Sequence, residues 1–400
     1  MKQKKIMALL VCATMFVAVL AGCSKETEAT PQEVTQPSIP EALPTGPAED
    51  SGIEPHSYGI DYDTAFKAFA PDTVMIIVGD YTVTWAELFF YIHDNIDGML
   101  QYGEIQNWSD ILYEDVTYAD IVLEYSIETA MMYKAVEYGA KLTGASLSED
   151  VMEIIRERYE SSIEQLGGEE EFLNTLWEMD GVSSLELYDY LVGIGPLVSA
   201  IFAEIYGENG ELLSDEDVAA YTAYDGYLMA KHILRLKTDE EGDTALSDSE
   251  EILAQLEGYV GADFEAFFDE LMWELSDDSG ALEIFPNGYL FQYGDMDPAF
   301  YDACVDLEIG EFSGIVETVY GYHIIYRIPV NYDEIPSLYY QQYSYGAISY
   351  YEYKSMMLRN IAALGMFDSE LYGWKDSLGI EYTAAYESMD FAKVFDVGEH

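Results

Sequence analysis

Two stretches, Ala230-Lys231-His232-Ile233-Leu234 and Gly321-Tyr322-His323-Ile324-Ile325, each place one of the chain's five histidines inside an apolar, strand-like run. The two runs bound a compact segment of about 100 residues. A buried imidazole must find hydrogen-bond partners or weaken the strand that carries it. We therefore expect the side chains of His232 and His323 to meet in one polar site, on a small domain that contains both strands.

The composition predicts folded domains with strongly negative surfaces. A chain of 400 residues is longer than one ordinary hydrophobic core and suggests two or three domains. It has 76 acidic against 17 basic residues and a net charge of −59, but its 50% hydrophobic content argues against wholesale disorder. Nucleic acid is not expected as a partner, because phosphate binding needs a basic stripe and the chain clusters lysines only at Lys2, Lys4 and Lys5.

The N-terminal residues predict export. Three lysines precede an apolar run from Ile6 to Leu20, which is too short to span a bilayer comfortably. The following Leu20-Ala21-Gly22-Cys23 resembles the bacterial lipobox, which implies a signal peptide over residues 1–22, lipidation of Cys23 and anchoring outside the cytoplasm on the bacterial cell membrane. A plain secretory signal with an incidental cysteine is the alternative. Residues 23–58 hold six of the chain's twelve prolines and predict a disordered tether.

Hydrophobic periodicity predicts an α+β chain. Two short strands are expected within residues 74–83, around a turn at Gly79-Asp80. A helix over 151–166 is expected to follow a capping box of Ser146 and Glu149. Further segments follow: helices over 118–136, 169–179, 185–206, 215–224, 249–259, 264–275 and 299–307, and strands over 227–236, 321–328 and 380–382. Residues 338–364 are rich in tyrosine and predict a helix that either packs internally or lines a cradle for unfolded chains.

Short blocks around the two histidines occur in a characteristic order. They are Leu275-Ser276-Asp277-Asp278-Ser279-Gly280, Asn287-Gly288-Tyr289-Leu290, Met296-Asp297-Pro298-Ala299-Phe300, and the run from Thr318 to Ile325. The series resembles the parvulin family of peptidyl-prolyl isomerases and, with the lipobox, the extracytoplasmic PrsA-like foldases. This resemblance implies a four-stranded antiparallel sheet wrapped by helices over residues 226–331. It also implies insertion into a mostly α-helical SurA/PrsA-like chaperone domain, formed by residues 59–225 with 332–400.

The resemblance also implies roles for individual residues. His232 and His323 match the family's histidine pair, Asp278 its acidic position and Thr318 the neighbouring hydroxyl. The apolar pocket for the proline ring is expected from three residues: Leu290, Met296 and Phe300. The chain departs from many parvulins where it reads Asn287-Gly288-Tyr289-Leu290-Phe291 instead of Gly-Gly-Asp-Leu-Gly, with shortened spacing to Met296. Neither a cofactor nor a metal ion is expected, and Cys304 is expected to be a small core residue.

These residue types suit rotation about an X-Pro bond, which breaks amide resonance against a barrier of about 18–20 kcal/mol. An apolar slot for the ring beside polar groups that favour a twisted amide stabilises the transition state. The implied function is a peptidyl-prolyl isomerase (EC 5.2.1.8) and chaperone that assists the folding of exported polypeptides containing X-Pro bonds. A holdase with a non-catalytic parvulin domain and a solute-binding lipoprotein remain alternatives. The acids of residues 238–243 argue against phosphorylated substrates, unless this loop is merely solvated.

Overall fold

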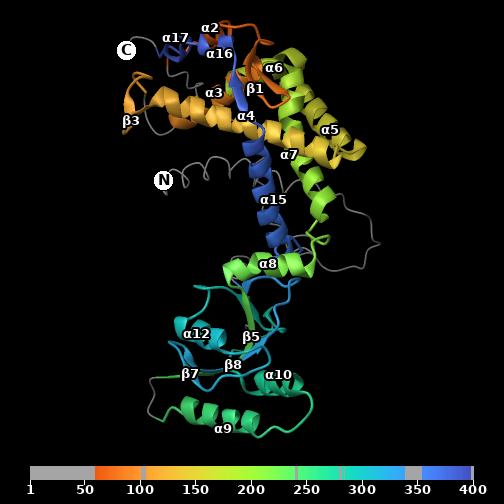
Figure 1. The fold of residues 1–400 in the computed structure, drawn as a ribbon, viewed down its shortest axis with the longest axis vertical. Helices are drawn as coiled ribbons and strands as arrows, with labels where there is room; N and C mark the ends of the chain where they lie inside the picture. Colours follow the sequence, from red (N-terminus) through yellow and green to blue (C-terminus); the bar gives the residue numbers. More distant parts are fainter. Residues whose placement is uncertain are drawn as a thin grey trace. The chain divides into compact units, whose positions relative to one another are not determined.

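The computed structural model describes residues 59–100, 105–238, 242–278, 282, 284–337 and 354–397. The expected signal peptide, Cys23, the tether and most of the tyrosine-rich stretch lie outside the described residues. The chain divides into two compact units, Met1–Glu204 with Ser369–His400, and Ile205–Asp368 (Figure 1). The second unit is wider than the expected domain of residues 226–331, and the expected domain bounds stay a prediction.

The first unit is mainly helical and also contains short strands. Two of these strands, β1 (Val74–Val78) and β2 (Tyr81–Thr84), pair antiparallel as expected, and β9 (Ile380–Tyr382) pairs with the other edge of β1. Further elements of this unit are α2 (Tyr62–Phe66), α3 (Trp85–Leu100), β3 (Ile111–Tyr113), β4 (Val116–Thr117), α4 (Tyr118–Thr143), α5 (Glu149–Leu166), α6 (Glu169–Asp180), α16 (Ala384–Glu387) and α17 (Phe391–Val394).

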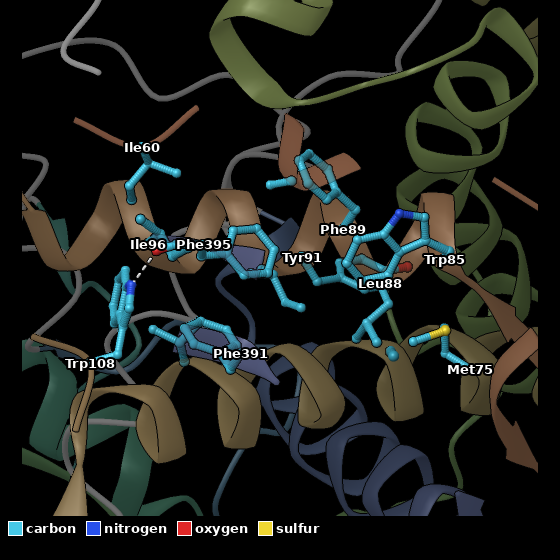
Figure 2. Packing of buried hydrophobic residues seen from close by; sticks show 14 of the residues in the cluster. Ile60, Met75, Trp85, Leu88, Phe89, Tyr91, Ile96, Trp108, Phe391 and Phe395 are labelled. Atoms are coloured by element: carbon cyan, nitrogen blue, oxygen red, sulfur yellow. Dashed lines mark hydrogen bonds between the residues drawn. The ribbon is translucent and has the colours of Figure 1, made fainter. Parts of the chain in front are cut away.

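Aromatic side chains fill the core of the first unit (Figure 2). Trp85 and Phe89 of α3 are fully buried, and their rings are 5.5 Å apart. Trp108 donates its indole N–H to the carbonyl oxygen of Phe395, as the dashed line in Figure 2 shows. A buried indole N–H needs such a partner. Residues near position 395 are therefore part of the same core as α3.

Local capping decides where several helices begin. The expected capping box at Ser146 is wrong, because α5 begins at Glu149 and its N-cap is Ser148, whose hydroxyl accepts a hydrogen bond from the Val151 amide at 3.2 Å. The expected N-cap Ser214 is confirmed for α8 (Asp215–Asp225). The predicted helix over 185–206 is confirmed as α7 (Leu185–Tyr206). Its length and composition would let it cross a membrane, but buried helices of soluble proteins share both properties.

The second unit contains the expected four-stranded antiparallel sheet, so the α+β prediction is confirmed. The strand order is β6-β5-β8-β7, with β5 and β8 in the centre. The elements of this unit after α8 are β5 (Leu228–Leu236), α9 (Ala245–Glu257), α10 (Phe264–Leu275), β6 (Tyr289–Phe291), α12 (Pro298–Asp306), β7 (Val316–Glu317) and β8 (Gly321–Ile328). The helix α15 (Leu358–Ser377) follows and continues into the first unit.

The two faces of this sheet carry separate cores, because side chains alternate along each strand. Met229, Ile233 and Ile324 pack with α9 and α10 on one face. Leu228 and Ile325 pack with α12 on the other face. Figure 1 shows α12 and the pair α9 and α10 on opposite sides of the sheet. We call these the α10 face and the α12 face.

Candidate active site

The register of the two central strands brings the histidines together. In the antiparallel pair β5 and β8, His232 lies opposite Ile325 and His323 lies opposite Leu234. Both imidazoles therefore project from the α12 face as diagonal neighbours. Their Nδ1 atoms are 2.9 Å apart, the ring centroids are 5.1 Å apart and the ring planes differ by 13°. The sequence expectation that His232 and His323 share one site is met in the structure.

Gly321 allows this register. A Cβ atom at position 321 would lie 2.1 Å from the carbonyl oxygen of Arg235, well inside any real contact distance. The first residue of β8 thus packs directly against the backbone of β5, and a side chain there would push the two strands apart. The close approach of these backbones fixes which residues of β8 face His232.

A hydrogen-bonded chain runs through both histidines. Asp278 Oδ2 lies 3.0 Å from His232 Nε2, and Thr318 Oγ1 lies 2.8 Å from His323 Nε2. Only 6% of the surface of His232 and 5% of those of His323 and Thr318 is exposed. The carboxylate of Asp278 is the more accessible end, with 25% of its side chain exposed. Four expected site residues therefore form one continuous network.

Chemistry assigns the direction of this network. An ionised Asp278 can only accept, so His232 donates to it from Nε2; for a neutral His232, Nδ1 is then an acceptor. His323 must then donate from Nδ1 and accept at Nε2 from the hydroxyl of Thr318. The Tyr320 amide donates to Thr318 Oγ1 at 3.2 Å, which is consistent with a hydroxyl that points its proton at His323. When both histidines are neutral, each hydrogen bond of the network then has one donor and one acceptor. If the direction were reversed, an unprotonated His232 Nε2 would face the Asp278 carboxylate, and two acceptors would meet.

The ionisation of the site agrees with this assignment. Burial, together with the nearby His232, lowers the pKa of His323 to about 4. Burial alone would raise the pKa of Asp278, but hydrogen bonds from His232 and Tyr289 bring this pKa below its ordinary value. Near neutral pH the site therefore holds an ionised carboxylate and an uncharged His323.

Tyr289 is a site residue that the sequence reasoning missed. Its hydroxyl donates to Asp278 Oδ2 at 2.6 Å, and its ring lies edge-on to His232 at 5.1 Å. Burial and the carboxylate of Asp278 raise the pKa of Tyr289 far above its ordinary value, so the phenol stays a donor. The sequence carried one signal for this role. The block Asn287-Gly288-Tyr289 departs from the family pattern by a tyrosine, whose hydroxyl can donate to a nearby carboxylate.

The segment after α10 holds Asp278 against the end of β5. The Ser276 hydroxyl accepts from the amides of Leu234 at 3.1 Å and Asp278 at 3.3 Å. The Asp277 amide donates to the carbonyl of Leu234 at 2.8 Å. These contacts attach Ser276 and Asp277 to Leu234 of the central strand β5. The position of the Asp278 carboxylate is therefore set by the sheet.

Aromatic residues form the apolar wall beside the network. Phe300 of α12 is edge-on to both imidazoles, at 5.3 Å from His232 and 5.4 Å from His323. Phe291 is fully buried, with its ring 5.7 Å from Phe300. Met296 is half-buried and packs on the same cluster. Met296 and Phe300 thus lie on the α12 face, the face from which both imidazoles project.

The assignment of Leu290 to this pocket needs correction. In β6, Leu290 pairs with Met229 and lies in the core of the α10 face, on the opposite side of the sheet from the histidines. Its neighbours Tyr289 and Phe291 project toward the α12 face. Side chains in a strand alternate, so an alignment by residue type that is off by one position moves the assigned side chain to the wrong face.

Within the described ranges, no group of three or more His, Cys, Asp or Glu side chains is arranged to hold a metal ion. Cys304 is buried and free, and burial raises the pKa of its thiol to about 11, as suits a core residue. A hollow of about 410 Å³ lies at α8, Tyr301 and Tyr332 and includes none of the network residues.

Sequence comparisons agree with this geometry. Residues 232–328 match the family model of the rotamase PPIC-type PPIase domain, and they begin at the first histidine of the network. The foldase protein PrsA of Halalkalibacterium halodurans is 34% identical over 191 residues, covering 45% of this chain and 52% of that protein. PrsA of Bacillus subtilis is 34% identical over 116 residues, covering 28% and 34%. The matched part thus spans about half or less of these two relatives.

Two solved structures are also similar to parts of the chain. The parvulin NmPin of Nitrosopumilus maritimus is 30% identical, with 26% of this chain and 97% of that chain covered and a TM-score of 0.20. PrsA of Bacillus subtilis is 19% identical, with 74% and 98% covered and a TM-score of 0.24.

The four-stranded sheet, the histidine network and the family match define a peptidyl-prolyl isomerase domain of the parvulin type within the second unit. Among proteins with such a domain, the chain is a relative of the PrsA foldases.

Proposed function

We propose that the chain is a peptidyl-prolyl cis-trans isomerase and chaperone for exported polypeptides. The observation that carries the proposal is the buried chain from Asp278 through His232 and His323 to Thr318, beside the wall of Phe300 and Met296. A polar network of this kind is costly inside an apolar core unless every group is satisfied. Here each group has a partner, and the network lies on the face that carries the half-buried Met296.

In the proposed reaction, the proline ring rests on Met296 and Phe300, and the X-Pro amide lies over the histidines. Rotation of this amide interrupts its resonance, and no covalent bond to the protein forms. Apolar contacts hold the ring equally in either isomer, so a gain in rate requires groups that favour the twisted amide over both planar states. We assign this role to the network: His323 and Thr318 face the amide, and Asp278 positions His232 by fixing its tautomer.

The cellular part of the proposal rests on the sequence and on the curated relatives. Those relatives are PrsA foldases, and the lipobox at residues 20–23 supports lipidation of Cys23 and an extracytoplasmic, membrane-anchored location. The partners are unfolded or partly folded exported chains with X-Pro bonds, and nucleic acid is not among them. We also propose that residues 59–225 with 332–400 form the chaperone part around an isomerase domain of residues 226–331, and that residues 23–58 are a tether.

The test is an NMR exchange assay on a proline tetrapeptide with the full chain after signal removal. Wild-type protein should accelerate exchange over buffer, and Thr318→Val should lower the rate at least tenfold. Thr175→Val, on α6 in the first unit, is the matched control and should match wild type. A folded wild-type protein that leaves exchange at the buffer rate but suppresses client aggregation would overturn the enzymatic part in favour of a holdase. Equal rates for both threonine variants would remove Thr318 from the mechanism.

The anchor is tested separately. Cys23→Ala should shift the protein from the membrane fraction to the soluble extracytoplasmic fraction of a bacterial host and remove the mass of the lipid. An unchanged distribution would contradict anchoring and favour a plain secretory signal. Neither outcome depends on isomerase activity.

A further inference from the structure

The segment that follows α10 passes along the edge of β5 from one face of the sheet to the other. The ladder between β5 and β6 covers residues 228–230. Beyond it, Ser276 and Asp277 take the place of a strand: the Leu234 amide donates to the Ser276 hydroxyl, and the Asp277 amide donates to the Leu234 carbonyl. The next residue, Asp278, is the one that reaches the histidines on the α12 face.

Two adjacent carboxylates in this segment have different partners. Asp277 Oδ1 accepts from Arg235 Nη1 at 2.9 Å, and its Oδ2 accepts from the Leu236 amide at 2.9 Å. Asp278 Oδ2 instead lies 3.0 Å from His232 Nε2. Both acids have the same chemistry toward an imidazole, since an ionised carboxylate of either residue accepts from its N–H. Their separate partners therefore decide which of the two reaches His232.

Arg235 holds the first of these acids on the α10 face. Side chains alternate along β5, so Arg235 projects from the face opposite to that of the histidines. Its Nη1 donates to the Leu275 carbonyl at 2.8 Å as well as to Asp277, and its Nη2 donates to Asp248 of α9 at 3.1 Å. The planar guanidinium thereby joins the end of α10, the segment after it and α9. Only 26% of this side chain is exposed, so salt screens these contacts less than contacts on an open surface.

We propose that Arg235 is a positioning residue for the isomerase site: by holding Asp277 on the α10 face, it places Asp278 against His232. The inference rests on the proposed isomerase function and adds to it a residue that touches none of the reacting atoms. Without the guanidinium, Asp277 would lose its charged partner and repel the neighbouring carboxylate. The two acids would then compete for the imidazole, and a shift of about 1 Å would already weaken the hydrogen bond that fixes the tautomer of His232.

The test compares Arg235→Met with wild type in the peptide exchange assay, using the full chain after signal removal. Arg235→Met should lower kcat by about ten- to a hundredfold, the cost of a misplaced supporting group. KM should stay close to its wild-type value, because the wall of Met296 and Phe300 is unchanged. Arg156→Met is the matched control. This arginine on α5 is paired with Glu153 at 2.8 Å and its side chain is 57% exposed, so its loss should change neither constant.

Two further measurements separate positioning from a loss of stability. Burial raises the pKa of Asp278, and hydrogen bonds from His232 and Tyr289 overcome this and hold the pKa below its ordinary value. When these bonds weaken in Arg235→Met, the carboxyl carbon of Asp278 should titrate at a higher pH by NMR than in wild type. Adding Asp277→Asn to Arg235→Met removes the competing carboxylate and should restore part of kcat, whereas a purely structural role predicts a further loss.

The outcomes separate this proposal from the one on which it rests. If wild type leaves exchange at the buffer rate, the isomerase function fails, and the titration of Asp278 alone decides the role of Arg235. If wild type is active, the role is overturned when Arg235→Met keeps the wild-type kcat, or loses activity with the titration of Asp278 unchanged. A double variant no more active than Arg235→Met would overturn the competition between the two acids.

Discussion

The depressed pKa of His323 makes the second unit sensitive to mild acid. Burial, with His232 nearby, lowers the pKa of His323 to about 4, whereas an unfolded histidine titrates near 6.5. The unfolded chain therefore binds the proton first as pH falls. The contribution of His323 to stability is complete above pH 6.5 and is lost progressively as pH falls from 6.5 toward 4.

The magnitude follows from these two pKa values. At pH 5 the unfolded imidazole is almost fully protonated and the folded one is almost fully neutral, which costs the folded state about 2 kcal/mol relative to pH 7. Asp278 adds little over this interval, because its pKa is below the ordinary carboxyl range and it stays ionised. His323→Gln removes the titration and keeps an amide that can hydrogen-bond to Thr318.

The assay has two parts, both on the full chain. Histidine NMR, with His323→Gln to assign the signal, should show one imidazole that titrates near 4. Amide exchange of the β5 and β8 backbone reports the unfolding free energy of this unit. Between pH 7 and pH 5 wild type should lose about 2 kcal/mol more than His323→Gln, as the two pKa values require. A His323 pKa of 6.5 or above, or equal losses in both proteins, would refute the reasoning.

Three further predictions concern the sheet, the pocket and the charge. Gly321→Ala should lower the unfolding free energy measured in urea by at least about 1–3 kcal/mol, because the new Cβ would lie 2.1 Å from the Arg235 carbonyl oxygen. The control Gly314→Ala, where nothing lies within 4 Å of the new Cβ, should be near neutral. Equal losses in both variants would contradict the close strand contact. Leu290→Ala should lower the unfolding free energy by about 2–5 kcal/mol and leave KM for a proline peptide unchanged. Phe300→Ala should raise this KM. A raised KM for Leu290→Ala would return Leu290 to the pocket. Residues 226–331 contain 23 acidic and 4 basic residues, so a Lys-Pro peptide should react faster than a Glu-Pro peptide at low salt. The ratio of the two rates should fall toward one at high salt, because salt screens the charges. A salt-independent ratio would rule out an electrostatic cause.

Local patterns in the sequence predicted the longer elements of the second unit but not its two short strands, β6 and β7. The expected bounds of the helix 264–275 and the strand 321–328 coincide with α10 and β8. The meeting of His232 and His323 was also predictable, since two imidazoles in apolar strands need polar partners. Family resemblance then added Asp278 and Thr318, whose positions depend on a segment after α10 and on a hairpin that periodicity alone does not define.

The errors arose where a shift of one or two residues changes the result. Leu290 matched the family pattern by residue type, but in β6 its side chain lies on the α10 face. Because the connection from β6 to Met296 is shortened, the sequence did not show which residues of β6 face the histidines. The alternation of side chains along β6 also made Tyr289 a partner of Asp278, which no composition or spacing argument specified. At α5, the predicted capping residue Ser146 lies two positions before the true N-cap, Ser148, and only the backbone shows which hydroxyl accepts from an amide.

The pairing of β1 with β9 has a consequence for biosynthesis. Ile76 and Tyr382 lie opposite each other in one sheet although about 300 residues separate them, and the entire second unit lies between. A ribosome makes the second unit in full before it makes the strand that completes the first. Since domains fold as their last strands emerge, the usual order is reversed here: the N-terminal unit must wait, with one edge of its sheet unpaired, until the inserted unit has been synthesised.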